Sequence, residues 1–184
     1  MDYTIRKAKL SDIPAIELLI DESVRTLAAN EYTNEQIEGA LKSAWGVDTQ
    51  LISDETYFAV ETGSQLIACG GWSYRETLFG NDSEAGRNPK MLNPAKDAAK
   101  IRAFFVRPSY ARMGIGSALM YKCEREARDK GFSHLELMAT LPGQKLYSRH
   151  GFVADTSIEY PLSDTLSITF IPMRKNIDKY PIET

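Results

Sequence analysis

A strand, a glycine-containing loop and a helix follow one another between residues 100 and 131, and this succession constrains the fold more than any other feature. Residues 100–106 are apolar and aromatic enough for a strand, and Pro108 ends it. Apolar residues then recur every three or four positions over residues 114–130, which predicts a helix with one buried face, and Gly131 is a good terminator. Residues 134–138 predict a further strand. The chain is therefore expected to contain a βαβ unit whose helix starts at a glycine-rich turn.

The start of this helix has the features of an anion site. A helix N-terminus offers unpaired N–H groups and a partial positive charge, and both favour a phosphate. Gly114 and Gly116 have no side chains, so an anion can approach the backbone closely, and Arg107 and Arg112 add charge at the rim. Taken alone, however, two glycines favour the simpler interpretation, a turn that only starts a helix.

Two common phosphate loops do not fit this segment. A P-loop needs Gly-Lys-Ser/Thr, whereas Gly116 is followed by Ser117 and Ala118. A dinucleotide loop needs a third glycine where Leu119 stands. Glu136 lies at the offset of a ribose-binding acid, but it falls inside a predicted strand. We therefore exclude both classes of nucleotide-binding loop.

The rest of the chain predicts a mixed α/β protein, and we expect one domain over residues 1–184 with a long loop at about 75–97 and a short C-terminal tail at about 175–184. Further strands are expected at residues 3–8, 57–61, 65–74, from 152 onward and at 167–173. Further helices are expected from residue 11 to residue 27, from residue 33 to residues 45–46, and over residues 142–149. Pro172 indicates that the last strand lies at an edge or ends irregularly.

Composition excludes several classes of protein. The chain has 184 residues, 43% hydrophobic and 26% charged, which suffices for a core without a disulfide or a structural metal. The net charge of −3 argues against a nucleic-acid partner, and no apolar run approaches the ~18 residues that cross a bilayer. No signal-peptide pattern opens the chain, and Cys69 and Cys123 lie in apolar patterns typical of reduced thiols. We expect a cytoplasmic protein with no metal site and no membrane partner.

Two motifs carry a family resemblance. Residues 104–119, FFVRPSYARMGIGSAL, resemble the acetyl-CoA motif of the GNAT superfamily of N-acetyltransferases, and residues 146–152, LYSRHGF, resemble its second signature. The opening residues 5–12 are also similar to GNAT starts, so the resemblance covers essentially the whole chain. Either motif alone is weakly specific, whereas both in this order and at this spacing are strongly so. The chain departs from the family at Ala111, where Gln or Arg is usual, and at Thr140, where Asn is common.

The resemblance implies a GNAT-like domain. Its fold class is α/β (mixed α+β), with a central, mixed, mostly antiparallel sheet of about seven strands that splays between strands 4 and 5, flanked by about four helices. The strand with Phe104, Phe105 and Val106 is expected to splay from a neighbour that starts at Phe152, and the pantetheine arm of acetyl-CoA would pair with its backbone in the gap. Wrapping of the diphosphate is expected from the backbone amides of Arg112, Met113, Gly114, Ile115, Gly116 and Ser117.

Tyr147 is the predicted proton donor to the departing thiolate. Acetyl transfer from a thioester to an amine needs a neutral amine, a stabilised oxyanion and a proton for the sulfur. A backbone N–H near Phe104 or Phe105 would stabilise the oxyanion. A phenol of pKa ≈ 10 hydrogen-bonds a thiolate readily, whose acid has a pKa near 8.5. Spacing alone favours a core aromatic at Tyr147, and the family motif shifts the balance to the catalytic role.

The general base is not identified by the sequence. Many relatives place an acid on the fourth strand, where this chain has Lys100, followed by Arg102. Both are expected to be solvated on an exposed strand face, although they could instead hold a carboxylate of the acceptor. Either the amine arrives with a low pKa and water suffices, or the base comes from elsewhere, with four candidates that sequence does not rank: Glu22, Glu31, Glu76 and Asp97.

The side chains around the acceptor are equally open. Trp45, Trp72, Tyr32 and Phe79 could line an acceptor pocket, although most such aromatics belong to the core. His134 and His150 are expected at the surface or in packing roles.

The predicted function is an acetyl-CoA-dependent N-acetyltransferase that uses a primary amine of a small molecule or peptide. The alternative is a module that binds acyl-CoA as a sensor or scaffold without turnover. Homodimer formation stays open.

Overall fold

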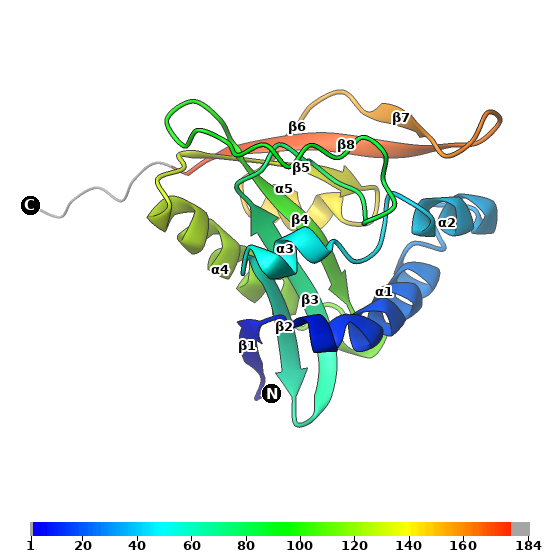
Figure 1. Ribbon diagram of the computed structural model, residues 1–184. Helices are drawn as coiled ribbons and strands as arrows, with labels where there is room; N and C mark the ends of the chain where they lie inside the picture. Colours follow the sequence, from blue (N-terminus) through cyan, green and yellow to red (C-terminus); the bar gives the residue numbers. More distant parts are fainter. Residues whose placement is uncertain (1, 178–184) are drawn as a thin grey trace, which may run out of the picture.

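The computed structural model describes residues 2–177, and within them one open sheet carries all the helices (Figure 1). Its eight strands are β1 Thr4–Lys7, β2 Tyr57–Thr62, β3 Gln65–Ser73, β4 Ala99–Val106, β5 His134–Thr140, β6 Val153–Ala154, β7 Ile158–Pro161 and β8 Ser167–Asn176. The five α-helices are α1 Ile13–Leu27, α2 Asn34–Leu41, α3 Thr49–Ser53, α4 Ile115–Asp129 and α5 Gln144–Arg149. Short 3-10 turns, Leu10–Asp12 and Pro108–Tyr110, precede α1 and follow β4.

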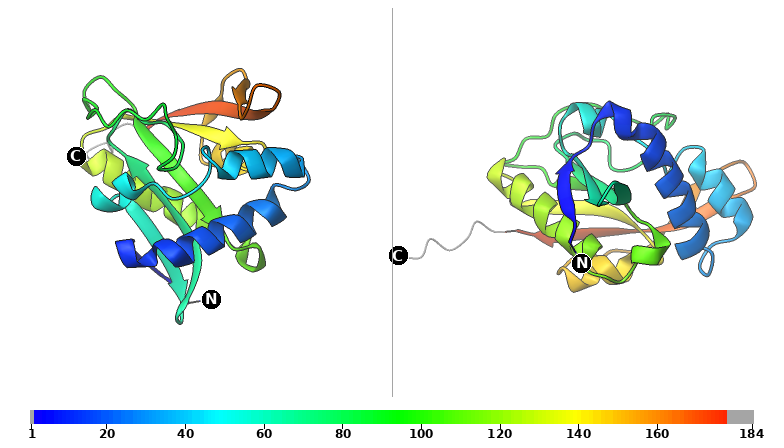
Figure 2. Two further views of the ribbon diagram at one scale, coloured as in Figure 1. Left: turned by 45° about the vertical axis from the view of Figure 1, so that its right-hand side comes forward. Right: turned by 90° about the horizontal axis from the view of Figure 1, so that it is seen from below.

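The sheet opens between β4 and β5. The strand order is β1-β2-β3-β4-β5-β8-β6, with β7 also paired to β8, and every pair except β4–β5 is antiparallel. The parallel pair has only two registered positions, Ala99 with Leu135 and Lys100 with Glu136. Beyond them β4 and β5 diverge, as the left view of Figure 2 shows. The predicted splay between the fourth and fifth strands is confirmed.

The two faces of the sheet carry separate cores. Side chains alternate across a strand, so Tyr57 and Ala59 of β2 pack on the α1 face while Phe58 and Val60 pack on the α4 face. Helix α1 contributes Ile16, Leu19 and Ile20 to the first core. Helix α4 buries Ile115, Leu119 and Cys123 in the second. The two long helices thus lie on opposite sides of β3 and β4, with the open gap between their ends (Figure 2).

The C-terminal strands differ from the expectation. Phe152 does not start the neighbour of β4: β6, which follows it, pairs with β8 at the far end of the sheet. Pro172 lies in β8, which is paired on both sides, so the expectation of an edge strand or irregular end is wrong. Pro172 faces the interval between β6 and β7, where its carbonyl accepts a hydrogen bond from the Asp155 N–H at 2.9 Å. That interval needs no N–H at this position, which explains why proline is tolerated.

Helix and tail boundaries also shift. Helix α2 ends at Leu41 instead of near Trp45, and α3 was not expected. Asp48 caps α3 by accepting the Gln50 N–H at 3.0 Å. Strand β8 runs two residues into the predicted tail, and residues 178–184 lie outside the described part of the chain. The strand and helix counts, eight and five, slightly exceed the about seven and about four that were expected, and the fold class is confirmed.

Candidate functional site

A bulge in β4 sets the geometry at the opening of the sheet. Ala103 and Phe104 together stand opposite the single Gly70 of β3, because the register slips between Cys69 and Gly71. Ala103 adopts a left-handed conformation with φ +53°, which a non-glycine residue rarely does. The buried Tyr57 hydroxyl donates to the Ala103 carbonyl at 3.0 Å and holds this conformation. The Phe104 ring lies so close over Gly70 that a Cβ there would stand 2.5 Å from it.

The loop before α4 presents free backbone donors. Gly114 has φ +86° and Arg112 has φ +66°, so the chain turns sharply into the helix. Among the described residues, none accepts a backbone hydrogen bond from the N–H groups of residues 112–117, whereas the next N–H, that of Ala118, donates to the Gly114 carbonyl. Six consecutive N–H groups are therefore available to an anion at a helix N-terminus.

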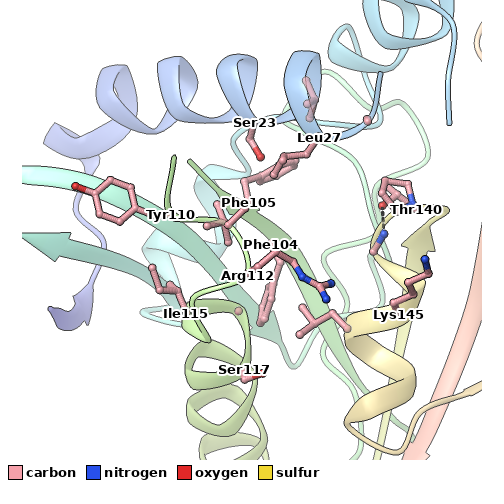
Figure 3. A pocket seen from close by; sticks show the side chains of 18 of the residues that line it. Ser23, Leu27, Phe104, Phe105, Tyr110, Arg112, Ile115, Ser117, Thr140 and Lys145 are labelled. Carbon is pink, nitrogen blue, oxygen red and sulfur yellow. Dashed lines mark hydrogen bonds between the residues drawn. The ribbon is translucent and has the colours of Figure 1, made fainter. Parts of the chain in front are cut away.

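Five of these six residues, all except Met113, line a cavity of about 370 Å³ that lies between α1, α4 and α5 (Figure 3). Ser23 and Leu27 of α1 form one wall, Ile115 and Ser117 of α4 form another, and Lys145 of α5 forms a third. The floor is β4 itself, through Phe104, Phe105 and Val106. The cavity thus follows the gap in the sheet from the helix start.

The charge of this cavity is entirely positive. Arg112, Lys145 and Arg149 line it, and no lining residue is an aspartate or glutamate. Lys145 and Arg149 come from α5, one turn apart, and were not singled out from the sequence. Such a wall favours a polyanionic ligand.

A second, smaller cavity of about 150 Å³ continues the first one through the sheet opening. The two share the Trp45 side chain, residues 104–106 of β4 and the α5 end with Gly143 and Leu146. Tyr147 lines the second cavity, where its ring lies 6.3 Å from that of Phe104 and 6.0 Å from that of Phe152. Burial raises the pKa of its phenol above the usual range, so Tyr147 remains protonated at neutral pH.

The predicted cofactor residues therefore gather around one continuous space. Eight of the nine line the larger cavity: Phe104, Phe105, Val106, Arg112, Gly114, Ile115, Gly116 and Ser117. Met113 is 53% exposed and lines neither cavity.

Lys100 and Arg102 are buried, which corrects the expectation of solvated charges. Only 7% of Lys100 and 2% of Arg102 are exposed. Lys100 forms an ion pair with Glu136 at the closed end of the β4–β5 gap. Arg102 donates to the Asp48 carboxylate at 2.8 Å and to the Thr77 and Gly80 carbonyls, both at 2.9 Å. Arg102 therefore clamps the segment around Phe79 to β4.

None of the four candidate bases lines either cavity. Glu22 pairs with Arg107, Glu76 pairs with Lys90, and Asp97 accepts the Asn93 N–H. The two cysteines are buried as expected, and burial raises the pKa of Cys69 to about 12 and that of Cys123 well above its ordinary value. Neither thiol is a nucleophile at neutral pH.

The aromatic and histidine candidates separate clearly. Trp45 and Phe79 line the second cavity, whereas Trp72 is 1% exposed in the α4-side core. Tyr32 is fixed by two hydrogen bonds of 2.8 Å, one to the Thr169 carbonyl and one from the Leu141 N–H. The His150 Nε2 lies 2.9 Å from the Ser117 hydroxyl, and burial lowers the pKa of His150, with Lys175 adding to the effect.

Comparison with known proteins identifies the family. The family model described as the acetyltransferase (GNAT) family matches residues 21–152, which is most of the chain. The chain belongs to the GNAT acetyltransferase family. No curated protein sequence matches it. Within residues 2–177 no helix is long and apolar enough to cross a membrane.

Solved structures share the fold at low sequence identity. A GCN5-related N-acetyltransferase from Rhodopseudomonas palustris, also named as an aminotransferase of class II, has a TM-score of 0.69 at 16% identity, with 96% of each chain covered. The PaiA N-acetyltransferase from Thermoplasma acidophilum, solved in complex with coenzyme A, has a TM-score of 0.64 at 19% identity, covering 96% of this chain and 99% of that one. The ribosomal-protein-S18-alanine N-acetyltransferase from Escherichia coli has a TM-score of 0.59 at 18% identity, covering 100% of this chain and 99% of that one.

Proposed function

We propose that this chain transfers an acetyl group from acetyl-CoA to a primary amine of a small molecule or peptide. The observation that carries the proposal is the continuous space that joins six free backbone donors at residues 112–117 to the phenol of Tyr147. Acetyl-CoA is long, polyanionic at one end and reactive at the other. A cationic cavity that narrows into an apolar one fits both ends of it.

The larger cavity suits the body of the cofactor. The N–H groups of residues 112–117 would bind the diphosphate, and Arg112, Lys145 and Arg149 would balance its charge. The absence of carboxylates from the lining of this cavity leaves no like-charge repulsion. The gap beyond Ala99 and Lys100 leaves the backbone of β4 without a ladder partner from β5, so the amide-rich pantetheine arm can pair with Phe104 and Val106.

The second cavity suits the reaction. The amine nitrogen would attack the thioester carbon directly, the C–S bond would break, and a backbone N–H near Phe104 or Phe105 would stabilise the tetrahedral oxyanion. Tyr147 would hydrogen-bond the sulfur and deliver a proton to it. A covalent acyl-cysteine is not part of this proposal, because burial keeps both thiols protonated.

A non-catalytic acyl-CoA sensor is the alternative function. One observation favours it: no carboxylate lines either cavity to act as general base. The deciding experiment measures CoA thiol release by the purified chain over a panel of aryl, alkyl and peptide amines. We expect release above the rate in water alone with at least one amine. A chain that binds acetyl-CoA and never exceeds the water rate is a sensor or scaffold.

A further inference from the structure

The second cavity contains no group that can balance a positive charge. Its lining residues include no aspartate or glutamate, and the charged member of the lining is Arg102. Two acids of the segments around it have partners of their own. Asp48 is shared between Arg102 and Arg87, and Glu84 accepts the Tyr160 hydroxyl at 2.5 Å. An ammonium group would therefore lose its hydration here and meet another cation.

The wall of this cavity is aromatic. Trp45, Phe79 and Phe170 line it from three separate segments, and Phe79 and Phe170 lie with ring centroids 5.8 Å apart. Tyr160 packs behind them, 5.0 Å from the Phe79 ring in an edge-to-face arrangement. Such surfaces favour a flat apolar group through burial and ring contacts.

The size of the cavity restricts the group further. A volume of about 150 Å³ equals that of an apolar protein cavity known to hold a benzene molecule. The Phe79 side of the cavity is held in place by the three hydrogen bonds of Arg102 to Thr77, Gly80 and Asp48. The Phe79 wall is thus held in place beside a space of about one aromatic ring.

We propose that the acceptor is a weakly basic amine attached directly to an aromatic ring, which enters this cavity uncharged. This inference rests on the proposed acetyl transfer and names its acceptor class. The neutral nitrogen attacks the acetyl carbon, an N–C bond forms and the C–S bond breaks. One proton leaves the nitrogen and one proton reaches the sulfur, so the products are an amide and the CoA thiol with no net proton released. The balance explains why a carboxylate base is not required at this site.

The test compares two amines of similar size, aniline and cyclohexylamine, with acetyl-CoA as donor. Purified protein is assayed for CoA release from pH 7 to pH 9, and the rates without protein are subtracted. We expect kcat/KM at pH 7 to be at least about tenfold higher for aniline. An alkyl amine has a pKa near 10.4, so its neutral fraction rises about tenfold per pH unit below that value. The kcat/KM for cyclohexylamine should rise accordingly, while that for aniline stays flat.

Three outcomes separate the proposals. Equal or better use of cyclohexylamine at pH 7, with turnover present, overturns the acceptor class and leaves acetyl transfer intact. Binding of acetyl-CoA without release to any amine overturns the transferase function itself. A strong preference for hexanoyl-CoA over acetyl-CoA also overturns the acceptor class, because the acyl chain would then fill the aromatic cavity.

A designed carboxylate provides an independent check. Phe79→Glu adds the missing negative charge beside the cavity, and Phe79→Gln adds the same bulk without charge. We expect cyclohexylamine kcat/KM at pH 7 to be about tenfold higher in Phe79→Glu than in Phe79→Gln, with acetyl-CoA affinity equal in both as a sign of intact folding. Equal use of cyclohexylamine by two folded variants overturns the proposal.

Discussion

Tyr147 combines a partly buried ring, packed against the α4-side core, with a place in the lining of the second cavity. Its ring packs against those of Phe104 and Phe152, and within residues 2–177 no residue forms a hydrogen bond with its hydroxyl. Burial raises its pKa, because the phenolate would lose its hydration. A phenol that stays protonated at neutral pH is suited to donate to a sulfur and unsuited to act as a base.

We therefore expect Tyr147→Phe to lower kcat by about 10²-fold, the usual range for removing a positioned acid. Acetyl-CoA affinity, measured by calorimetry, should remain within about twofold because the ring contacts persist. Full activity of the variant across the pH range would show that another group protonates the thiolate.

Gly116 tests the anion site in the same way. A Cβ at this position would lie 3.1 Å from the Leu146 Cδ2, so any side chain is tight, and a negative one would also repel a diphosphate. We expect Gly116→Glu to weaken acetyl-CoA binding at least about tenfold more than Gly116→Gln, which has the same bulk. Equal affinities, in variants with unchanged circular dichroism, would show that the N–H groups of residues 112–117 do not bind the diphosphate.

The sequence predicted the backbone part of this site better than its side chains. Glycines indicate a helix start through the local sequence alone, so the role of Gly114 and Gly116 can be predicted without knowledge of the fold. Lys145 and Arg149 are ordinary cations of a short helix until α5 is folded against the gap. The sequence predicted a solvated Arg102 because its partner Asp48 lies far away along the chain.

At the scale of elements, Asp48 connects three segments, and two of them, β4 and the long loop, line the second cavity. It caps α3 through the Gln50 N–H, and its carboxylate accepts Arg102 of β4 and Arg87 of the long loop. The carboxylate is 1% exposed and balances the charge of the buried Arg102, whereas Arg87 also pairs with Asp82.

Replacing Asp48 by Asn keeps its size and removes the charge that Arg102 and Arg87 share. We expect Asp48→Asn to lower the free energy of unfolding by about 3–5 kcal/mol, the range found when one partner of a buried ion pair is removed. Urea denaturation provides the measurement. Asp82→Asn is the matched control, because Asp82 pairs with the same Arg87 at 44% exposure and should cost about 1 kcal/mol or less. Similar losses of unfolding free energy in both variants would contradict a stabilising role for the buried Asp48–Arg102 ion pair.

The element boundaries that sequence missed have local causes. The helix expected to reach Trp45 ends at Leu41 because the Trp45 N–H donates to the Ala40 carbonyl in a turn. Helix α3 spans five residues, too few for a periodic pattern to emerge. Long helices such as α1 and α4 could be predicted, because the spacing of their apolar residues indicates which face is buried.

At the scale of the whole molecule, several carboxylates tie distant segments together and thereby couple stability to pH. Hydrogen bonds from Arg6 lower the pKa of Asp12, and they link β1 to the start of α1. Burial raises the pKa of Asp54, but two hydrogen bonds from Arg75 outweigh it, so the pKa is lowered. Burial also raises the pKa of Glu126, but hydrogen bonds from Lys7, Trp72 and Lys122 outweigh it, so this pKa is lowered as well.

Each of these acids has a lower pKa in the folded chain than in the unfolded one. Their stabilisation is fully present above the unfolded values, about 3.9 for Asp and 4.3 for Glu, and is lost as the pH falls through the folded values. We therefore expect the free energy of unfolding to decline below about pH 4. Urea titrations from pH 7 to pH 3 measure it, and Asp54→Asn should reduce the slope. A free energy of unfolding that does not change from pH 7 to pH 3 would contradict the lowered pKa values of these acids.

Within residues 2–177 the ladder between β4 and β5 has only two registered positions, so the two parts of the sheet share backbone pairing at one end alone. On the proposed function, acetyl-CoA would bind between the diverging strands β4 and β5 and supply the contacts that they do not make with each other. Ligand that binds only the folded state raises stability in proportion to the logarithm of its concentration. The persistence of the folded chain would then follow the cellular supply of coenzyme A and its thioesters, since all of them have the same diphosphate and pantetheine arm.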